Sequence, residues 1–201
     1  MPSWPFDGLM PIRYGVILSD PPWRYVMRSA RGHDKSPEAH YQTMGLDEIS
    51  AMPVSHLAGP DCLLFLWSTW PHLTQALQIM QGWGFTYVTG GAWLKRTTHG
   101  KAAFGTGYVL RSATEPFLVG KIGAPRIRSR SCRNLIEADE DSLPDTIDSL
   151  RREHSRKPVE MRQMIDQLLP DVWGCELFAR EPWAGRDVWG NEATKFGGGD
   201  G

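Results

Sequence analysis

The segment Asp20-Pro21-Pro22-Trp23 combines groups that could hold an exocyclic amine. The Asp20 carboxylate and the Pro21 carbonyl can each accept one of the two amine hydrogens. Both prolines end a strand ladder and stiffen the chain, because neither has an N–H to donate. Trp23 could stack on the base that carries the amine, so this segment suits an adenine that has left its stack. The alternative for Asp20 is an ordinary turn former at a strand end.

Lys157 is a second candidate, because Pro158 suits the first position of a helix. The free N–H groups of a helix N-terminus favour anions, so Lys157 could add its charge to a site for a carboxylate. The alternative is a solvated lysine in the basic run RREHSRK.

Glu176, Phe178 and Arg180 alternate in the segment GCELFAR, residues 174–180. Alternate residues of a strand face the same side, so we expect these three on one face. Charged residues are uncommon on a fully buried face. The alternation therefore indicates either an ion pair across that face or a contact with a ligand.

Basic residues gather in three segments, 24–41, 96–107 and 126–130. The first two are predicted loops, and loops of this length are often functional lids or disordered. The residues predicted to contact nucleic-acid phosphates are Arg24, Arg28, Arg31, Lys101, Arg126 and Arg128. Arg130 continues the last row. For that row a solvated loop that balances the acidic run 137–141 is the alternative.

Composition favours one soluble domain, residues 1–195, followed by a flexible tail, 196–201. The 201 residues carry a net charge of −1, so nucleic-acid binding would need local basic patches. Three separated cysteines without a CxxC pair argue against a structural zinc site or a disulfide framework. We expect no metal and no membrane segment, and we predict a cytoplasmic location.

The elements that must position these residues alternate between strands and helices. Apolar runs predict strands at 14–19, 62–67, 85–96, 115–123, 134–138 and 174–180, and helical periodicity predicts helices at 44–54, 72–84 and 158–170. This order predicts an α/β fold with a mostly parallel sheet and helices on both faces. Asp20 would then lie beyond the carboxyl end of a strand, where such sheets bind ligands.

Several segments, taken in order, resemble the MT-A-seventy family of adenine-N6 methyltransferases. They are DPPW, HYQTMGLDEI, LLFLWST, EPFLVGKIG, HSRKPVEMRQMIDQL, and CELFAR followed by WGNE. The resemblance covers residues 14–192. It implies a Rossmann-like methyltransferase fold in which the cofactor-binding strand comes late in the chain, by circular permutation. The sequence agrees in having no GxGxxG after its first strand.

The resemblance implies an S-adenosylmethionine-dependent enzyme that methylates adenine N6. Catalysis would involve Asp20, Pro21, Pro22 and Trp23. The cofactor-binding residues would be Asp20, Lys157, Glu176, Phe178, Arg180, Asn191 and Glu192. Pro182-Trp183 stands where some relatives carry His-Asn, so this part of the cofactor contact set is left open.

DNA is favoured as the substrate because no RNA-binding domain is appended to the methyltransferase domain. Two alternatives remain open: an RNA adenine-N6 methyltransferase, and a non-catalytic nucleic-acid-binding partner subunit. Degenerate partner subunits typically lack the aspartate and the lysine, and this chain has both, as Asp20 and Lys157. The oligomeric state is open, with a homodimer as one alternative.

Overall fold

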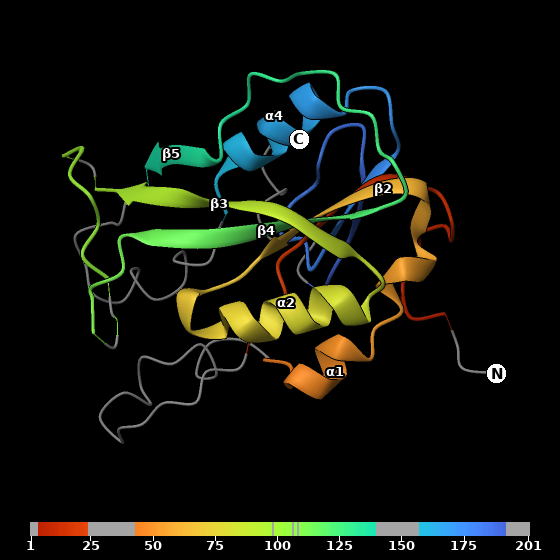
Figure 1. The fold of residues 1–201 in the computed structure, drawn as a ribbon, viewed down its shortest axis with the longest axis horizontal. Helices are drawn as coiled ribbons and strands as arrows, with labels where there is room; N and C mark the ends of the chain where they lie inside the picture. Colours follow the sequence, from red (N-terminus) through yellow and green to blue (C-terminus); the bar gives the residue numbers. More distant parts are fainter. Residues whose placement is uncertain are drawn as a thin grey trace, which may run out of the picture.

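A seven-stranded sheet runs through the protein, with helices on both of its faces (Figure 1). The computed structural model describes residues 4–23, 43–97, 99–105, 107, 109–139 and 157–191. Its strands are β1 (Tyr14–Ser19), β2 (Ala58–Trp67), β3 (Thr86–Arg96), β4 (Thr114–Ile122), β5 (Leu135–Asp139), β6 (Gly174–Leu177) and β7 (Asp187–Trp189). Its helices are α1 (Leu46–Ser50), α2 (Leu73–Gly82) and α4 (Val159–Leu168), with the 3₁₀ turns η3 (Val54–His56) and η4 (Trp70–His72).

The strand order is β5-β3-β4-β2-β1-β6-β7. β1 pairs in parallel with β2 and β6, β6 with β7, and β3 with β5, whereas β4 is antiparallel to both of its neighbours. The predicted mostly parallel sheet is therefore confirmed. Because β4 runs in the opposite direction, its first residues lie beside the carboxyl ends of β2 and β3.

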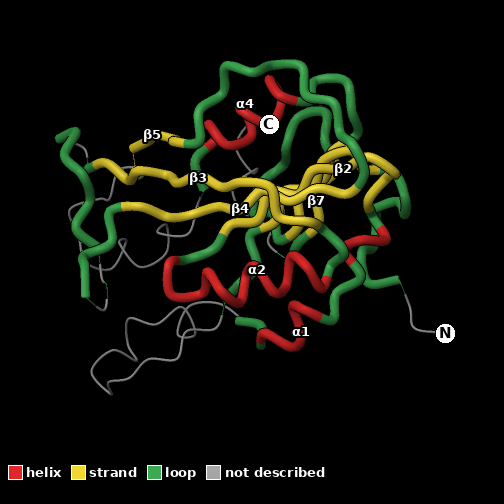
Figure 2. Tube along the Cα trace, in the orientation of Figure 1, coloured by secondary structure: helices red, strands yellow, loops and turns green. Residues whose placement is uncertain are grey.

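The sheet separates two apolar cores, as the alternation along β1 illustrates. Ile17 packs with Ile79 and Met80 of α2 on one face, and Val16 and Leu18 belong to the cluster of α4 on the other. Figure 2 shows α1 and α2 together on one side of the strands and α4 on the opposite side. A strand buried on both faces carries a continuous apolar sequence, which is why VIL has no polar alternation.

Most predicted elements are confirmed, with differences at the ends. β2 begins at Ala58 rather than at residue 62, and α1 ends at Ser50. β6 ends at Leu177 instead of Arg180, because Phe178 has a φ of +63°, which no strand accommodates. The three-residue β7 was not predicted, because so short an edge strand has no periodicity to detect.

Candidate active site

Four charged side chains form a row at the carboxyl end of the parallel strands. The Lys157 Nζ atom lies 3.0 Å from Asp20 Oδ2 and 2.7 Å from Glu115 Oε1. Glu115 Oε2 lies 3.1 Å from Lys95 Nζ. The row thus alternates in sign, in the order Lys95, Glu115, Lys157, Asp20. All four side chains are largely buried, which strengthens the attraction between neighbours.

The sheet explains why residues so distant in sequence meet here. Asp20 directly follows β1, and its N–H donates to the Leu177 carbonyl at the end of β6. Glu115 is the second residue of β4 and pairs with Trp93 of β3, the strand that also carries Lys95. Lys157 lies immediately before Pro158, the N-cap of α4.

Two buried indoles line the row. Lys157 Nζ lies 5.5 Å from the centroid of the Trp67 ring, and Lys95 Nζ lies 4.7 Å from that of Trp93. The two rings meet edge to face at 6.4 Å. An aromatic face attracts a cation without accepting its proton, so both ammonium groups are held while water is excluded beneath them.

Burial and neighbouring charges shift the pKa values in opposite directions. Burial raises the pKa of Asp20, and although Lys157 opposes this, the pKa stays above its usual value. Burial alone would raise the pKa of Glu115, but Lys157 and Lys95 bring it below its usual value. Burial would lower the pKa of Lys157, yet Asp20 and Glu115 raise it. Lys157 therefore stays charged, and of the two carboxylates in the row Asp20 is the one whose charged form would gain from a further cationic or amine partner.

A cleft opens beside this row, between the carboxyl ends of β1 and β6 and the N-terminus of α4. The space between its walls, part of which is open solvent, amounts to about 390 Å³. Its walls are Leu18, Asp20, Lys157, Pro158, Met161, Arg162, Glu176, Phe178, Arg180 and Glu181. β1 pairs with β2, the next strand along the chain, on one side and with β6 on the other. The strand order therefore changes direction at β1, and the cleft lies at this topological switch point.

Glu176 faces this cleft and is paired with Arg162 of α4. The Arg162 Nε atom donates to Glu176 Oε2 at 2.8 Å, and Nη1 donates to Glu181 Oε1 at 3.3 Å. Burial raises the pKa of Glu176 to about 7, although Arg162 opposes the rise. Glu176 is therefore ion-paired, but with a cation from α4, which differs from the alternative of a pair within its own segment.

Phe178 and Arg180 do line the cleft with Glu176, although the strand that was expected to align them ends at Leu177. The Phe178 ring packs edge to face on Trp189, with centroids 5.5 Å apart. Asn191 is exposed, and Glu192 lies outside the described residues. The structure thus brings five predicted cofactor residues together: Asp20, Lys157, Glu176, Phe178 and Arg180.

Trp23 does not occupy the position predicted for a base-stacking ring. It is 5% exposed, its ring stacks on His72 with centroids 5.8 Å apart, and its Nε1 donates to the Trp67 carbonyl. Trp23 itself packs into the core, a position that disfavours stacking on a target base. The Pro21 carbonyl accepts the Trp23 N–H at 2.8 Å, which still leaves one lone pair for a ligand.

Of the predicted phosphate contacts, Lys101, Arg126 and Arg128 lie in the part of the chain that the structure describes. Lys101 is exposed and its carbonyl accepts from Thr97, in the turn that directly follows β3 and Lys95. Arg24, Arg28 and Arg31 lie outside the described residues.

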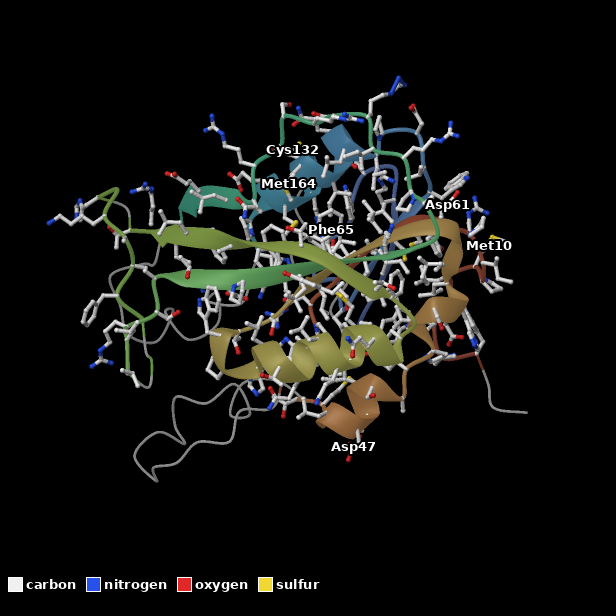
Figure 3. The ribbon with its side chains drawn as sticks, viewed as in Figure 1. Met10, Asp47, Asp61, Phe65, Cys132 and Met164 are labelled. Atoms are coloured by element: carbon white, nitrogen blue, oxygen red, sulfur yellow. The ribbon has the colours of Figure 1, made fainter. Side chains whose placement is uncertain are left out.

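The row of Arg126 and Arg128 is not brought to the cleft. Ala124 donates to Asp61 Oδ1, and Figure 3 shows Asp61 near the start of β2, away from the carboxyl end. The Arg128 N–H bonds the carbonyl of Leu168, the last residue of α4, whose first turn faces the cleft. Arg128 also pairs with Asp171 at 2.7 Å. A phosphate contact by this row stays a prediction, and it would need a second surface.

Sequence reasoning missed Lys95, Glu115 and Arg162 as members of the site. The available signal was a charged residue at the end of an otherwise apolar strand, as in AWLKR and EPFLVG. Such a residue is costly to bury unless it is paired. The partner could not be named, because pairing depends on how the strands are ordered.

In the part of the chain that the structure describes, no three side chains of His, Cys, Asp or Glu gather in a way that could hold a metal ion. None of the helices described is long and apolar enough to cross a membrane.

Comparison with known proteins places this chain among methyltransferases. Residues 14–192 match the sequence model of the MT-A70 family. The type II methyltransferase M.MunI of a Mycoplasma species is 30% identical, over 94% of this chain and 83% of that protein. The N6-methyladenosine RNA methyltransferase MTA1 of Cryphonectria parasitica is 30% identical, over 91% of this chain and 52% of that protein. Human N(6)-adenine-specific methyltransferase METTL4 is also 30% identical, but the chain spans 38% of it.

Proposed function

Because the chain belongs to the MT-A70 family of adenine-N6 methyltransferases, we propose that it transfers a methyl group from S-adenosylmethionine to adenine N6 in DNA. The observation that carries this proposal is the Asp20 carboxylate, held 3.0 Å from Lys157 at the mouth of the cleft. A largely buried carboxylate with a raised pKa is poised to accept hydrogen bonds from an amine.

The cleft suits an amino-acid-bearing cofactor. Its cations, from Lys157, Arg162 and Arg180, match a carboxylate, and the carboxylates of Asp20 and Glu176 match an ammonium. The first turn of α4 adds free N–H groups on the same side. The Phe178 ring offers apolar surface for an adenosine. Bound S-adenosylmethionine would supply a methyl group activated by a sulfonium.

Asp20 and the Pro21 carbonyl would hold the two hydrogens of the target amine. This arrangement favours a pyramidal nitrogen whose lone pair points at the methyl group, and it stabilises the positive charge that develops there. As the nitrogen–carbon bond forms, the carbon–sulfur bond breaks. The product ammonium is acidic and then loses one proton, so Asp20 need not deprotonate the amine beforehand. Alignment of the two atoms would supply much of the acceleration.

DNA is proposed as the substrate because the likeness to the type II methyltransferase M.MunI extends over 83% of that protein, whereas the likeness to the RNA methyltransferase MTA1 extends over 52%. RNA is the alternative, supported by the likeness to MTA1. A non-catalytic partner subunit is less well supported, because such a chain has no need for a paired Asp20 and Lys157.

Methyl transfer to DNA and RNA oligonucleotides, single- and double-stranded, tests the proposal directly. With labelled S-adenosylmethionine, we expect transfer to adenine-containing DNA and loss of roughly 100- to 1000-fold in rate for Asp20→Ala. Asp47→Ala makes the same change on the exposed first turn of α1, shown pointing away from the sheet in Figure 3, and should act like the wild type. Near wild-type transfer by Asp20→Ala would refute the role of Asp20. Transfer to RNA alone would show that RNA, and not DNA, is the substrate.

A further inference from the structure

Trp70 is an exposed aromatic residue with an unusually well-fixed ring. Its side chain is 50% exposed, yet its Nε1 atom donates to both the carbonyl and the hydroxyl of Thr114, at 3.2 and 3.0 Å. Because hydrogen bonds hold the Nε1 edge of this exposed indole, the ring keeps one face towards the solvent and cannot turn freely. Ring order of this kind lowers the entropy cost of binding a flat partner.

The turn that carries Trp70 is itself held from both sides. Pro71 lies in the first turn of η4, and Thr69 Oγ1 lies 2.9 Å from His72 Nδ1. The His72 ring, buried, stacks on Trp23. The tryptophan of the DPPW segment therefore supports the turn from within and helps to fix the direction of Trp70.

Trp70 borders the active site through Thr114. The next residue is Glu115, which contacts Lys157 and so connects to Asp20. The Thr114 carbonyl that accepts from Trp70 also accepts from the Ser112 hydroxyl, at the base of the loop between β3 and β4. Trp70 is absent from the walls of the cofactor cleft. It follows the carboxyl end of β2, on the same edge of the sheet where Asp20 follows β1.

We propose that the Trp70 indole stacks on the base that flanks the target adenine in the substrate strand. The inference rests on the proposed function, because it places the target amine at Asp20. That amine must reach a carboxylate that is only 17% exposed, so the target base itself is withdrawn into the protein. The base next to the target remains outside, at the opening of the active site, where the half-exposed Trp70 ring can stack on it. Every base has a π face, so this contact adds affinity with little sequence preference.

Trp173 provides the matched control. Among the described residues, it and Trp70 are the tryptophans that belong to the exposed large hydrophobic side chains, at 57% and 50%. Trp173 precedes β6 and its carbonyl accepts from Gly15, so it lies at the opposite end of the sheet. The Arg13 guanidinium covers its ring at 3.8 Å.

Fluorescence anisotropy with a labelled single-stranded DNA oligonucleotide that contains one adenine tests the inference. We expect Trp70→Ala to weaken binding roughly 5- to 150-fold, which corresponds to about 1–3 kcal/mol. Trp70→Phe keeps a ring but loses the bonds to Thr114, so its affinity should lie between those of the wild type and Trp70→Ala. Trp173→Ala should bind as the wild type does.

The same titrations are then repeated with oligonucleotides in which the nucleotide on one side of the adenine, and in a second strand on the other side, is abasic. When the stacked base is missing, wild-type binding should fall to the level of Trp70→Ala, and the substitution should have no further effect. Unchanged binding by Trp70→Ala, or an equal loss on intact and abasic strands, would overturn the stacking. If the wild type methylates none of the oligonucleotides, the proposed function fails, whereas the same titrations still decide whether Trp70 stacks on a base.

Discussion

Replacing Glu176 with glutamine should make the stability of the protein less dependent on pH. Glu176 is 8% exposed and its carboxylate lies against Arg162 in the cofactor cleft. Burial raises its pKa from 4.5 to about 7 in the folded protein. In the unfolded chain the same group would titrate near its usual value.

The sign follows from proton binding. Between pH 4.5 and about 7 the folded state keeps a proton on Glu176 that the unfolded state has lost. The free energy of unfolding therefore falls as pH rises through this window. Above the window Glu176 is deprotonated in both states, so it adds no further dependence on pH. The difference between 4.5 and about 7, at about 1.36 kcal/mol per pKa unit, corresponds to roughly 3 kcal/mol. Glutamine resembles the protonated form and removes this loss.

Urea unfolding at a series of pH values from 4.5 to 8 measures the effect. Asp20 and Glu115 also titrate, so the informative quantity is the wild-type free energy of unfolding minus that of Glu176→Gln at each pH. This difference should become more negative by about 3 kcal/mol across the window. Glu137→Gln makes the same change in a half-exposed glutamate that is also paired with an arginine, Arg96. Parallel curves for the wild type and Glu176→Gln would refute the argument that burial outweighs the Arg162 contact.

Two further outcomes are expected at the site. Lys157→Ala should weaken S-adenosylmethionine binding by roughly 10- to 150-fold in calorimetric titration, since a charge-assisted hydrogen bond contributes about 1.5–3 kcal/mol; an unchanged dissociation constant would exclude that contact. Gly190→Ala should lower the thermal midpoint, because a Cβ there would lie 2.7 Å from the Ala179 carbonyl oxygen and 2.8 Å from its nitrogen. A midpoint equal to that of the wild type would mean that the backbone at Gly190, just after β7, can move away from Ala179 and make room for the Cβ.

The sequence by itself determined the local features of this protein. The apolar run that ends at Asp20 specified a buried strand with a carboxylate at its carboxyl end, because two prolines cannot extend the ladder. Helical periodicity and Pro158 specified α4, with Lys157 just before it. Motif order indicated the family and, through it, half of the residues that line the cleft. These features are encoded within a few residues of chain, where periodicity and backbone restriction act.

Only the tertiary structure decided which side chains are partners. Glu115 meets Lys157 because β4 is antiparallel, which turns its first residues towards the carboxyl ends of its neighbours. Glu176 takes its cation from α4 rather than from its own segment.

Trp23 and Trp70 show that the sequence also could not decide which of two tryptophan rings near the site is buried. Trp23 is buried against His72, whereas Trp70, in the turn η4 after β2, is half-exposed and bonded to Thr114. Their sequence neighbourhoods, PPW and TWP, both combine proline and tryptophan, so no local rule separates them. The burial of a large ring depends on which surfaces the completed sheet leaves uncovered, and that is a property of packing over the whole domain.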